Sequence, residues 1–134
     1  MRTRFVAASL LTLVLGAGAV TSAGSPSRQW AIVYLHDYTL IGATMVQGPV
    51  LFVHDDQRMA RGEPCTTVQL FEPGRGASEL IADFHCIPAR RPVVHRFTIR
   101  TRPNVADGFG CVLTEFQFAG DAEGHAVPLQ GNAH

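Results

Sequence analysis

Short runs rich in Val, Thr, Ile and Phe alternate with turn-forming residues along the chain after residue 29. Runs of this length and spacing are typical of a β-sandwich or barrel, and no helical period persists for more than about two turns. The pattern therefore predicts an all-β fold, a small antiparallel β-sandwich or partly open barrel of about seven strands. The predicted strands are residues 30–35, 38–46, 50–54, 66–71, 79–86, 93–101 and 112–118.

The clearest alternation of apolar and polar positions lies in residues 93–102. Because successive side chains of a strand point to opposite faces, this strand should bury one face, which includes His95, and expose the other. A hairpin with residues 110–118 would place Glu115 or Glu123 near the exposed face. That face carries three arginines: Arg96, Arg100 and Arg102.

The first 23 residues contain the three parts of a secretory signal peptide. A positively charged start with Arg2 and Arg4 precedes an uncharged apolar run over residues 5–20, and small residues follow as far as Ala23. The apolar run is shorter than the about 20 residues that a membrane span needs. We expect cleavage after Ala23, a periplasmic or secreted location, and no membrane span after cleavage.

The chain after the signal peptide has the length of one domain. We expect a single β domain over residues 24–120. Residues 121–134 show no periodicity and are predicted to form a flexible C-terminal tail.

The charge balance argues against one class of partner. With Arg2 and Arg4 removed, nine of the 11 basic residues remain against 11 acidic residues. This balance gives no support for nucleic-acid binding, which depends on neutralising several phosphates. All basic residues are arginine and none is lysine, a bias that indicates a bacterial genome of high G+C content.

Three cysteines follow the signal peptide: Cys65, Cys86 and Cys111. The segment between the first two is predicted to be a hairpin with its turn centred on residues 75 and 76. In that register, residues whose numbers add to 151 face each other, so Cys65 lies opposite Cys86, close enough for a disulfide. Since exported proteins enter compartments in which disulfides persist, we expect a structural Cys65–Cys86 disulfide. Cys111 would be the remaining thiol, either buried or paired between chains.

Histidine, methionine and cysteine side chains provide one candidate metal site. Imidazole nitrogen and sulfur are ligands that suit copper or zinc. The candidate ligands are His54, Met59 and His85, and the cofactor would be copper, zinc or haem. No spacing such as CxxC, HxxxH or CxxCH is present, so this site depends on the fold to bring the three residues together.

A polar loop over residues 55–64 and the arginine face form a candidate binding surface. Loops on a rigid β scaffold often carry binding, although arginines on a strand also protect sheet edges from pairing. No GxSxG or SxxK motif indicates a catalytic nucleophile. We expect a non-catalytic binding or interaction module of the bacterial cell envelope, whose partner is a protein, glycan or small ligand. The alternative is a small periplasmic metal or haem carrier. The candidate surface residues are Arg58, Arg61, Arg96, Arg100 and Arg102.

Overall fold

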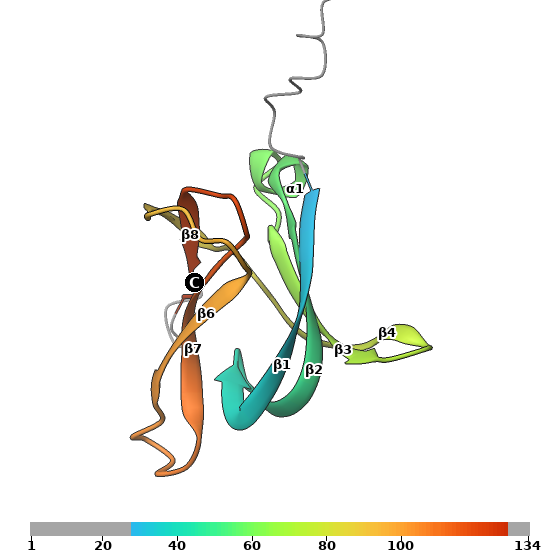
Figure 1. The fold of residues 1–134 in the computed structure, drawn as a ribbon, viewed down its shortest axis with the longest axis vertical. Helices are drawn as coiled ribbons and strands as arrows, with labels where there is room; N and C mark the ends of the chain where they lie inside the picture. The colour runs from blue at the N-terminus through green and yellow to red at the C-terminus, as the bar shows by residue number, and fades with distance from the viewer. Residues whose placement is uncertain (1–27, 129–134) are drawn as a thin grey trace, which may run out of the picture.

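The computed structural model of the chain describes residues 28–128, so the predicted signal peptide lies outside the described residues. This region folds into eight strands and one short helix (Figure 1). No helix within it has the length and apolar character needed to cross a membrane. The elements are β1 (Arg28–Ile41), β2 (Thr44–Asp55), α1 (Asp56–Ala60), β3 (Thr66–Glu72), β4 (Gly76–Phe84), β5 (Ile87–Arg90), β6 (Thr98–Pro103), β7 (Cys111–Gln117) and β8 (Glu123–Ala126).

The strands form a single sheet that curls into a half-barrel (Figure 1). The strand order is β4-β3-β2-β1-β7-β8-β5, and β6 pairs with β7 off this path. All pairs are antiparallel except β1 and β7, which run parallel where Thr39 and Leu40 face Cys111 and Val112. The mostly β fold is thus confirmed, and its arrangement is one curled sheet.

Two short connections shape this sheet. β4 and β5 stand at opposite ends of the strand order, although only residues 85 and 86 separate them in the chain. This connection therefore joins the two margins of the curled sheet. β1 and β2 form a long hairpin that turns at Gly42, whose positive φ of 62° suits glycine. The turn falls within the predicted strand 38–46, so that strand is divided between β1 and β2.

Alternate side chains of β2 point inward and build much of the core. Val50 and Phe52 are buried there, and His54 ends the same alternating row. Phe116 of β7 packs against Phe52 with the two ring centroids 5.2 Å apart. Burying one large apolar side chain contributes about 1.5–3 kcal/mol. The alternation that forms the core therefore also carries a histidine into it.

The C-terminal half of the chain differs from the sequence prediction in three places. β6 begins only at Thr98, where its pairing with β7 starts, and His95 is exposed instead of buried. The four-residue strand β5 was not predicted. β8 lies inside the predicted flexible tail, yet it pairs with both β5 and β7. Residues 123–126 therefore belong to the sheet.

The β3–β4 hairpin is present, but its predicted register is wrong. Thr66 faces Phe84, a pair whose numbers add to 150, and Glu72 faces Gly76, a pair that adds to 148. The turn centres on Gly74, which has a positive φ of 84°, and two register shifts follow along β3. Such shifts arise from extra residues on one strand, which an alternating sequence pattern does not reveal.

Candidate metal centre

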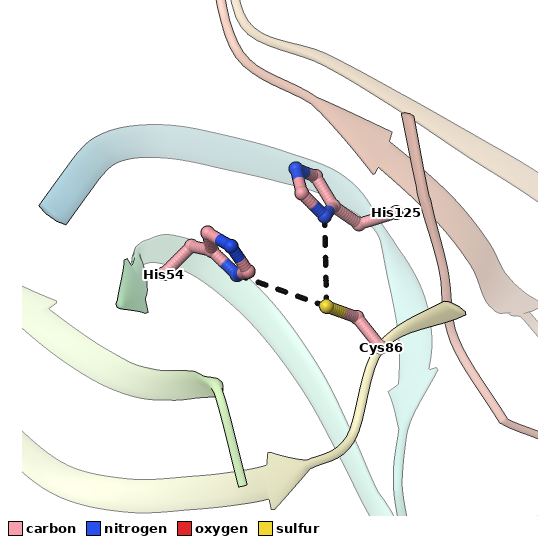
Figure 2. A group of neighbouring side chains, drawn as sticks. All are labelled: His54, Cys86 and His125. Atoms are coloured by element: carbon pink, nitrogen blue, oxygen red, sulfur yellow. Dashed lines mark hydrogen bonds between the residues drawn. The ribbon is translucent and has the colours of Figure 1, made fainter. Parts of the chain in front are cut away.

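A buried group of two imidazoles and one thiol lies at the connection between the sheet margins (Figure 2). His54 comes from the end of β2, His125 from β8, and Cys86 from the link between β4 and β5. One donor atom from each residue lies within 4.8 Å of the other two. The Sγ atom of Cys86 is 3.7 Å from Nδ1 of His54 and 3.5 Å from Nδ1 of His125.

His54 is held on both of its ring nitrogens. Its Nε2 atom lies 2.8 Å from Oδ1 of Asp56, and its Nδ1 atom lies 3.2 Å from Oγ1 of Thr66. Asp56 is the first residue of α1, which begins directly after β2 because the Asp55 carboxylate accepts a hydrogen bond from the N–H of Gln57. The early helix start thus brings a carboxylate back toward the histidine.

The surroundings of His54 favour its charged form. Burial alone would lower the pKa of His54, but contacts with Cys65 and with Asp56 outweigh burial, so the pKa lies above its usual value. The ring is 1% exposed and its centroid lies 4.3 Å from that of His125. Two imidazoles at this separation repel each other when both are protonated.

His125 is buried with one ring nitrogen unsatisfied. The residue faces Phe116 across the β7–β8 ladder, and the two rings stack with centroids 5.0 Å apart. Nδ1 faces Cys86 and lies 3.7 Å from Oε1 of Glu123. Nε2 has no hydrogen-bond partner among the described residues. Burial, followed by the charge of His54, lowers the pKa of His125 to about 4, so its imidazole is neutral at neutral pH.

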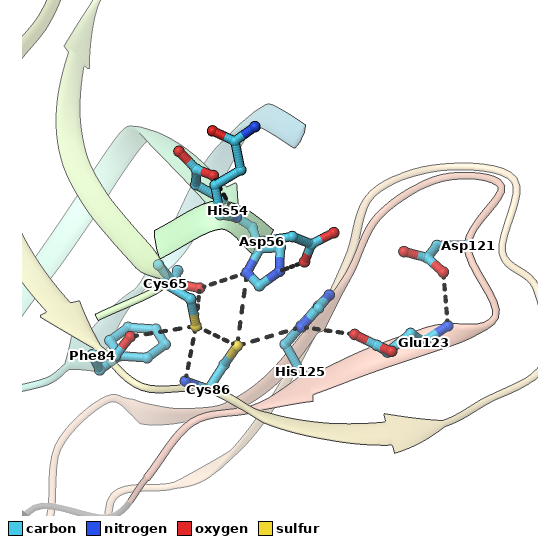
Figure 3. Close-up of polar contacts among 11 residues, drawn as sticks. His54, Asp56, Cys65, Phe84, Cys86, Asp121, Glu123 and His125 are labelled. Atoms are coloured by element: carbon cyan, nitrogen blue, oxygen red, sulfur yellow. Dashed lines mark hydrogen bonds and ion pairs between the residues drawn. The ribbon is translucent and has the colours of Figure 1, made fainter. Parts of the chain in front are cut away.

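Cys65 lies beside Cys86 and directly precedes β3 (Figure 3). The two Sγ atoms are 2.8 Å apart, and the Cys86 N–H donates a hydrogen bond to Sγ of Cys65 at 3.3 Å. Both cysteines are free in the structure, so the predicted disulfide stays a prediction. The hydrogen bond from the Cys86 thiol lowers the pKa of Cys65 to about 3, and the same contact raises the pKa of Cys86.

The three donors fit a transition metal in type, and the two sulfur–nitrogen separations fit its size. Neutral imidazole and thiolate suit zinc and copper(I). A tetrahedral zinc ion holds sulfur at about 2.3 Å and nitrogen at about 2.0–2.1 Å. One sulfur ligand and one nitrogen ligand then lie about 3.6 Å apart. The observed sulfur–nitrogen distances of 3.5 and 3.7 Å bracket that value. The Asp56 carboxylate on Nε2 of His54 matches the outer partner that usually orients a histidine ligand, whereas Glu123 lies on the Nδ1 side of His125.

The structure brings together only part of the predicted metal set. His54 lies in the centre described above, whereas His85 is exposed and does not belong to it. Met59 lies on α1 with 37% of its surface exposed. Cys86 was predicted as half of a disulfide and, beside His85, as a neighbour of the metal site, and His125 was placed in a flexible tail. The one sequence signal for His125 was the apolar residues Ala126 and Val127 beside it.

The predicted arginine surface divides into paired and exposed members. The β6–β7 hairpin is present as predicted, and Arg100 faces Glu115 across it at 3.1 Å. Arg58 and Arg61 both pair with Glu63, at 3.5 and 3.0 Å. The remaining two are exposed: Arg96 and Arg102. Three of the five residues therefore already pair with carboxylates, and the binding surface stays a prediction.

No protein family, curated protein or solved structure matches this chain. The chemistry assigned to the three donors therefore rests on their own geometry, burial and partners.

Proposed function

We propose that this protein is an exported metal-binding module that holds one zinc or copper(I) ion between His54, Cys86 and His125. The observation that carries the proposal is the convergence of three buried donors, one from each of three distant segments, within 4.8 Å. The exported location is the expectation drawn from the N-terminal sequence. The general expectation of a non-catalytic binding module is kept, with a metal ion as its ligand.

The alternative that these are ordinary core residues does not explain why two imidazoles and a thiol converge in the core. Nε2 of His125 is buried without a partner, which costs about 1–3 kcal/mol, and this cost remains when a metal binds at Nδ1, the nitrogen that faces Cys86. His54 and His125 repel each other when both are protonated, because their ring centroids lie only 4.3 Å apart. A bound cation favours neutral imidazoles and a thiolate at once, since metal binding displaces protons from its ligands. Metal binding therefore accounts for the convergence of the three donors, which apolar packing does not explain.

Burial of the site favours holding an ion over performing chemistry with it. His54 and His125 are each 1% exposed, and Cys86 is 8% exposed. Catalytic zinc sites keep an open position for water or substrate, and these three residues leave little surface from which a substrate could enter. A carrier or a structural metal site needs no such access.

The first test is native mass spectrometry of the full-length gene product, exported in bacteria and purified anaerobically without chelators. After exposure to zinc or to copper(I), we expect one ion per chain, with its element identified by plasma mass spectrometry. His125→Phe keeps the stack on Phe116 but removes both nitrogens, and Cys86→Ser removes the thiolate, so each should abolish stoichiometric binding.

Matched controls separate the site from the rest of the molecule. His85→Asn and Cys111→Ser change the same residue types outside the centre and should keep one ion per chain. Asp56→Asn should weaken affinity by about 10–100-fold, as loss of an outer partner of a histidine ligand does. Equal binding by the wild type and by both site variants would refute the proposal, as would no binding of either metal.

A further inference from the structure

We propose that Cys65 and Cys86 form a thiol–disulfide switch that decides whether the centre can hold its metal. The inference rests on the proposed function, because it assigns regulation to the same site. Cys86 has two competing neighbours: the imidazoles of His54 and His125 at 3.7 and 3.5 Å, and the sulfur of Cys65 at 2.8 Å. One sulfur cannot serve both arrangements.

The Cys86 sulfur can bind a metal only as a thiolate, and a disulfide bond removes that form. A metal takes the thiolate as its ligand, and ligands of this kind must lose their proton on binding. A sulfur that has joined a disulfide carries no such charge. Oxidation therefore removes one of three donors and leaves two buried imidazoles, one of them without a partner on Nε2.

Cys65 is placed to act as the partner thiol instead of a fourth ligand. The group of donors that lie within 4.8 Å of one another contains Cys86 but not Cys65. The N–H of Cys86 donates to Sγ of Cys65, which fixes that sulfur on the side of Cys86 turned toward β3. A disulfide bond is about 2.0 Å long, so the two sulfurs need to approach by less than about 1 Å from their separation of 2.8 Å.

The switching step needs a disulfide oxidant, for which oxidised glutathione serves as the reagent. Cys65 is buried, so it reacts while local opening of the site admits the reagent. Its thiolate then attacks one glutathione sulfur, forming a mixed disulfide and releasing one glutathione thiolate. The Cys86 sulfur then attacks the Cys65 sulfur and releases the second glutathione. The two cysteines lose two protons and two electrons, and the glutathione disulfide gains both pairs as two thiols. Reduced glutathione in excess reverses each step.

The test uses the full chain carrying Cys111→Ser, so that Cys65 and Cys86 are the only thiols. Protein is reduced, stripped of metal and divided, and one half is treated with oxidised glutathione. Native mass spectrometry after zinc addition reads the metal on each mass species separately. We expect one zinc on the reduced chain. The chain that is lighter by two hydrogen atoms should bind zinc more than about 100-fold more weakly, since losing a ligand exceeds the loss of an outer partner.

Variants of Cys65 separate the switch from damage to the fold. Cys65→Ser and Cys65→Ala should bind zinc as the reduced parent does. After treatment with oxidised glutathione, the variant chains that carry no glutathione adduct should keep the zinc affinity of the reduced parent. Circular dichroism checks that each variant is folded. The zinc affinity is then taken from the variant that is folded. Recovery of zinc binding when the oxidised parent is reduced again completes the expected pattern.

The outcomes distinguish the two proposals. If the reduced chain binds neither zinc nor copper(I), the proposed function itself fails. If the reduced chain binds zinc and the disulfide form binds it equally well, the switch fails while metal binding stands. Failure of the metal-free chain to form the disulfide also overturns the switch. Loss of zinc from both folded Cys65 variants would show that Cys65 is a ligand, contrary to its assignment as partner thiol.

Discussion

Glu115 supports the sharpest prediction about stability that the structure offers. Its side chain is 6% exposed, accepts a hydrogen bond from Nε of Arg91 at 2.9 Å, and pairs with Nε of Arg100 at 3.1 Å. Glu115→Gln keeps the shape but removes the charge. Hydrogen bonds to charged groups contribute about 1.5–3 kcal/mol, and partly exposed ion pairs no more than about 1 kcal/mol. Because the glutamine oxygen can still accept from Arg91, we expect a loss of about 2 kcal/mol.

Urea unfolding followed by circular dichroism measures this loss. The midpoint should fall while the dependence on urea concentration stays constant, as expected for a change in stability alone. Arg91→Met in both backgrounds completes a double-mutant cycle, and the coupling energy should be at least about 1 kcal/mol. Glu79→Gln, an exposed change on β4, should stay within about 0.5 kcal/mol. A loss below about 0.5 kcal/mol for Glu115→Gln, or no coupling, would refute the reasoning.

Three further predictions concern the core, the site and one turn. Phe116 is fully buried, so Phe116→Ala should lower the free energy of unfolding by about 3–5 kcal/mol in the same urea assay. Burial lowers the pKa of His125 to about 4, so between pH 6.5 and 4 the unfolded chain binds a proton that the folded chain does not. The reduced, chelated protein should therefore lose stability as pH falls through that window, by about 3 kcal/mol in total, and His125→Phe should flatten the profile. Gly110 has a φ of 71°, and an added Cβ would lie 2.5 Å from the carbonyl oxygen of Tyr38, so Gly110→Ala should lower the melting temperature. Gly108→Ala, where φ is 66° and nothing lies within 4 Å, should have the smaller effect of about 1–2 kcal/mol that strain alone produces, and equal effects would contradict the close contact.

Local pattern was enough to predict most strands but not how they join. The alternation in β2 reflects one buried face, and a period of two in the sequence reports that directly, whereas β7 buries Glu115 and Gln117 on one face and Phe116 on the other. The four-residue strands β5 and β8 are too short to show a period. They are strands because β5 pairs with β8, and β8 also pairs with β7. The sequence of such a short segment does not indicate which distant strand it will pair with.

The same distinction explains which site residues the sequence could predict. His54 ends an alternating row, so its burial follows from β2 itself. His125 is buried only because β8 pairs with β7, which no local feature reveals. Cys86 was predicted beside Cys65 from a register that is wrong. The two sulfurs meet because the ladder ends at Phe84, and the chain then turns at residues 85 and 86 to reach β5.

The two proposed states of Cys86 tie together different parts of the molecule. A metal would link it to His54, 32 residues earlier, and to His125, 39 residues later, and so fasten β8 to the end of β2 across the margins of the sheet. A disulfide would link it to Cys65, 21 residues earlier, within neighbouring strands that already pair. Closing the longer loops restricts the unfolded chain more, and only the metal constrains β8. In the proposed switch, the position of one sulfur between two partners would couple the redox state of a hairpin to the link between β8 and β2.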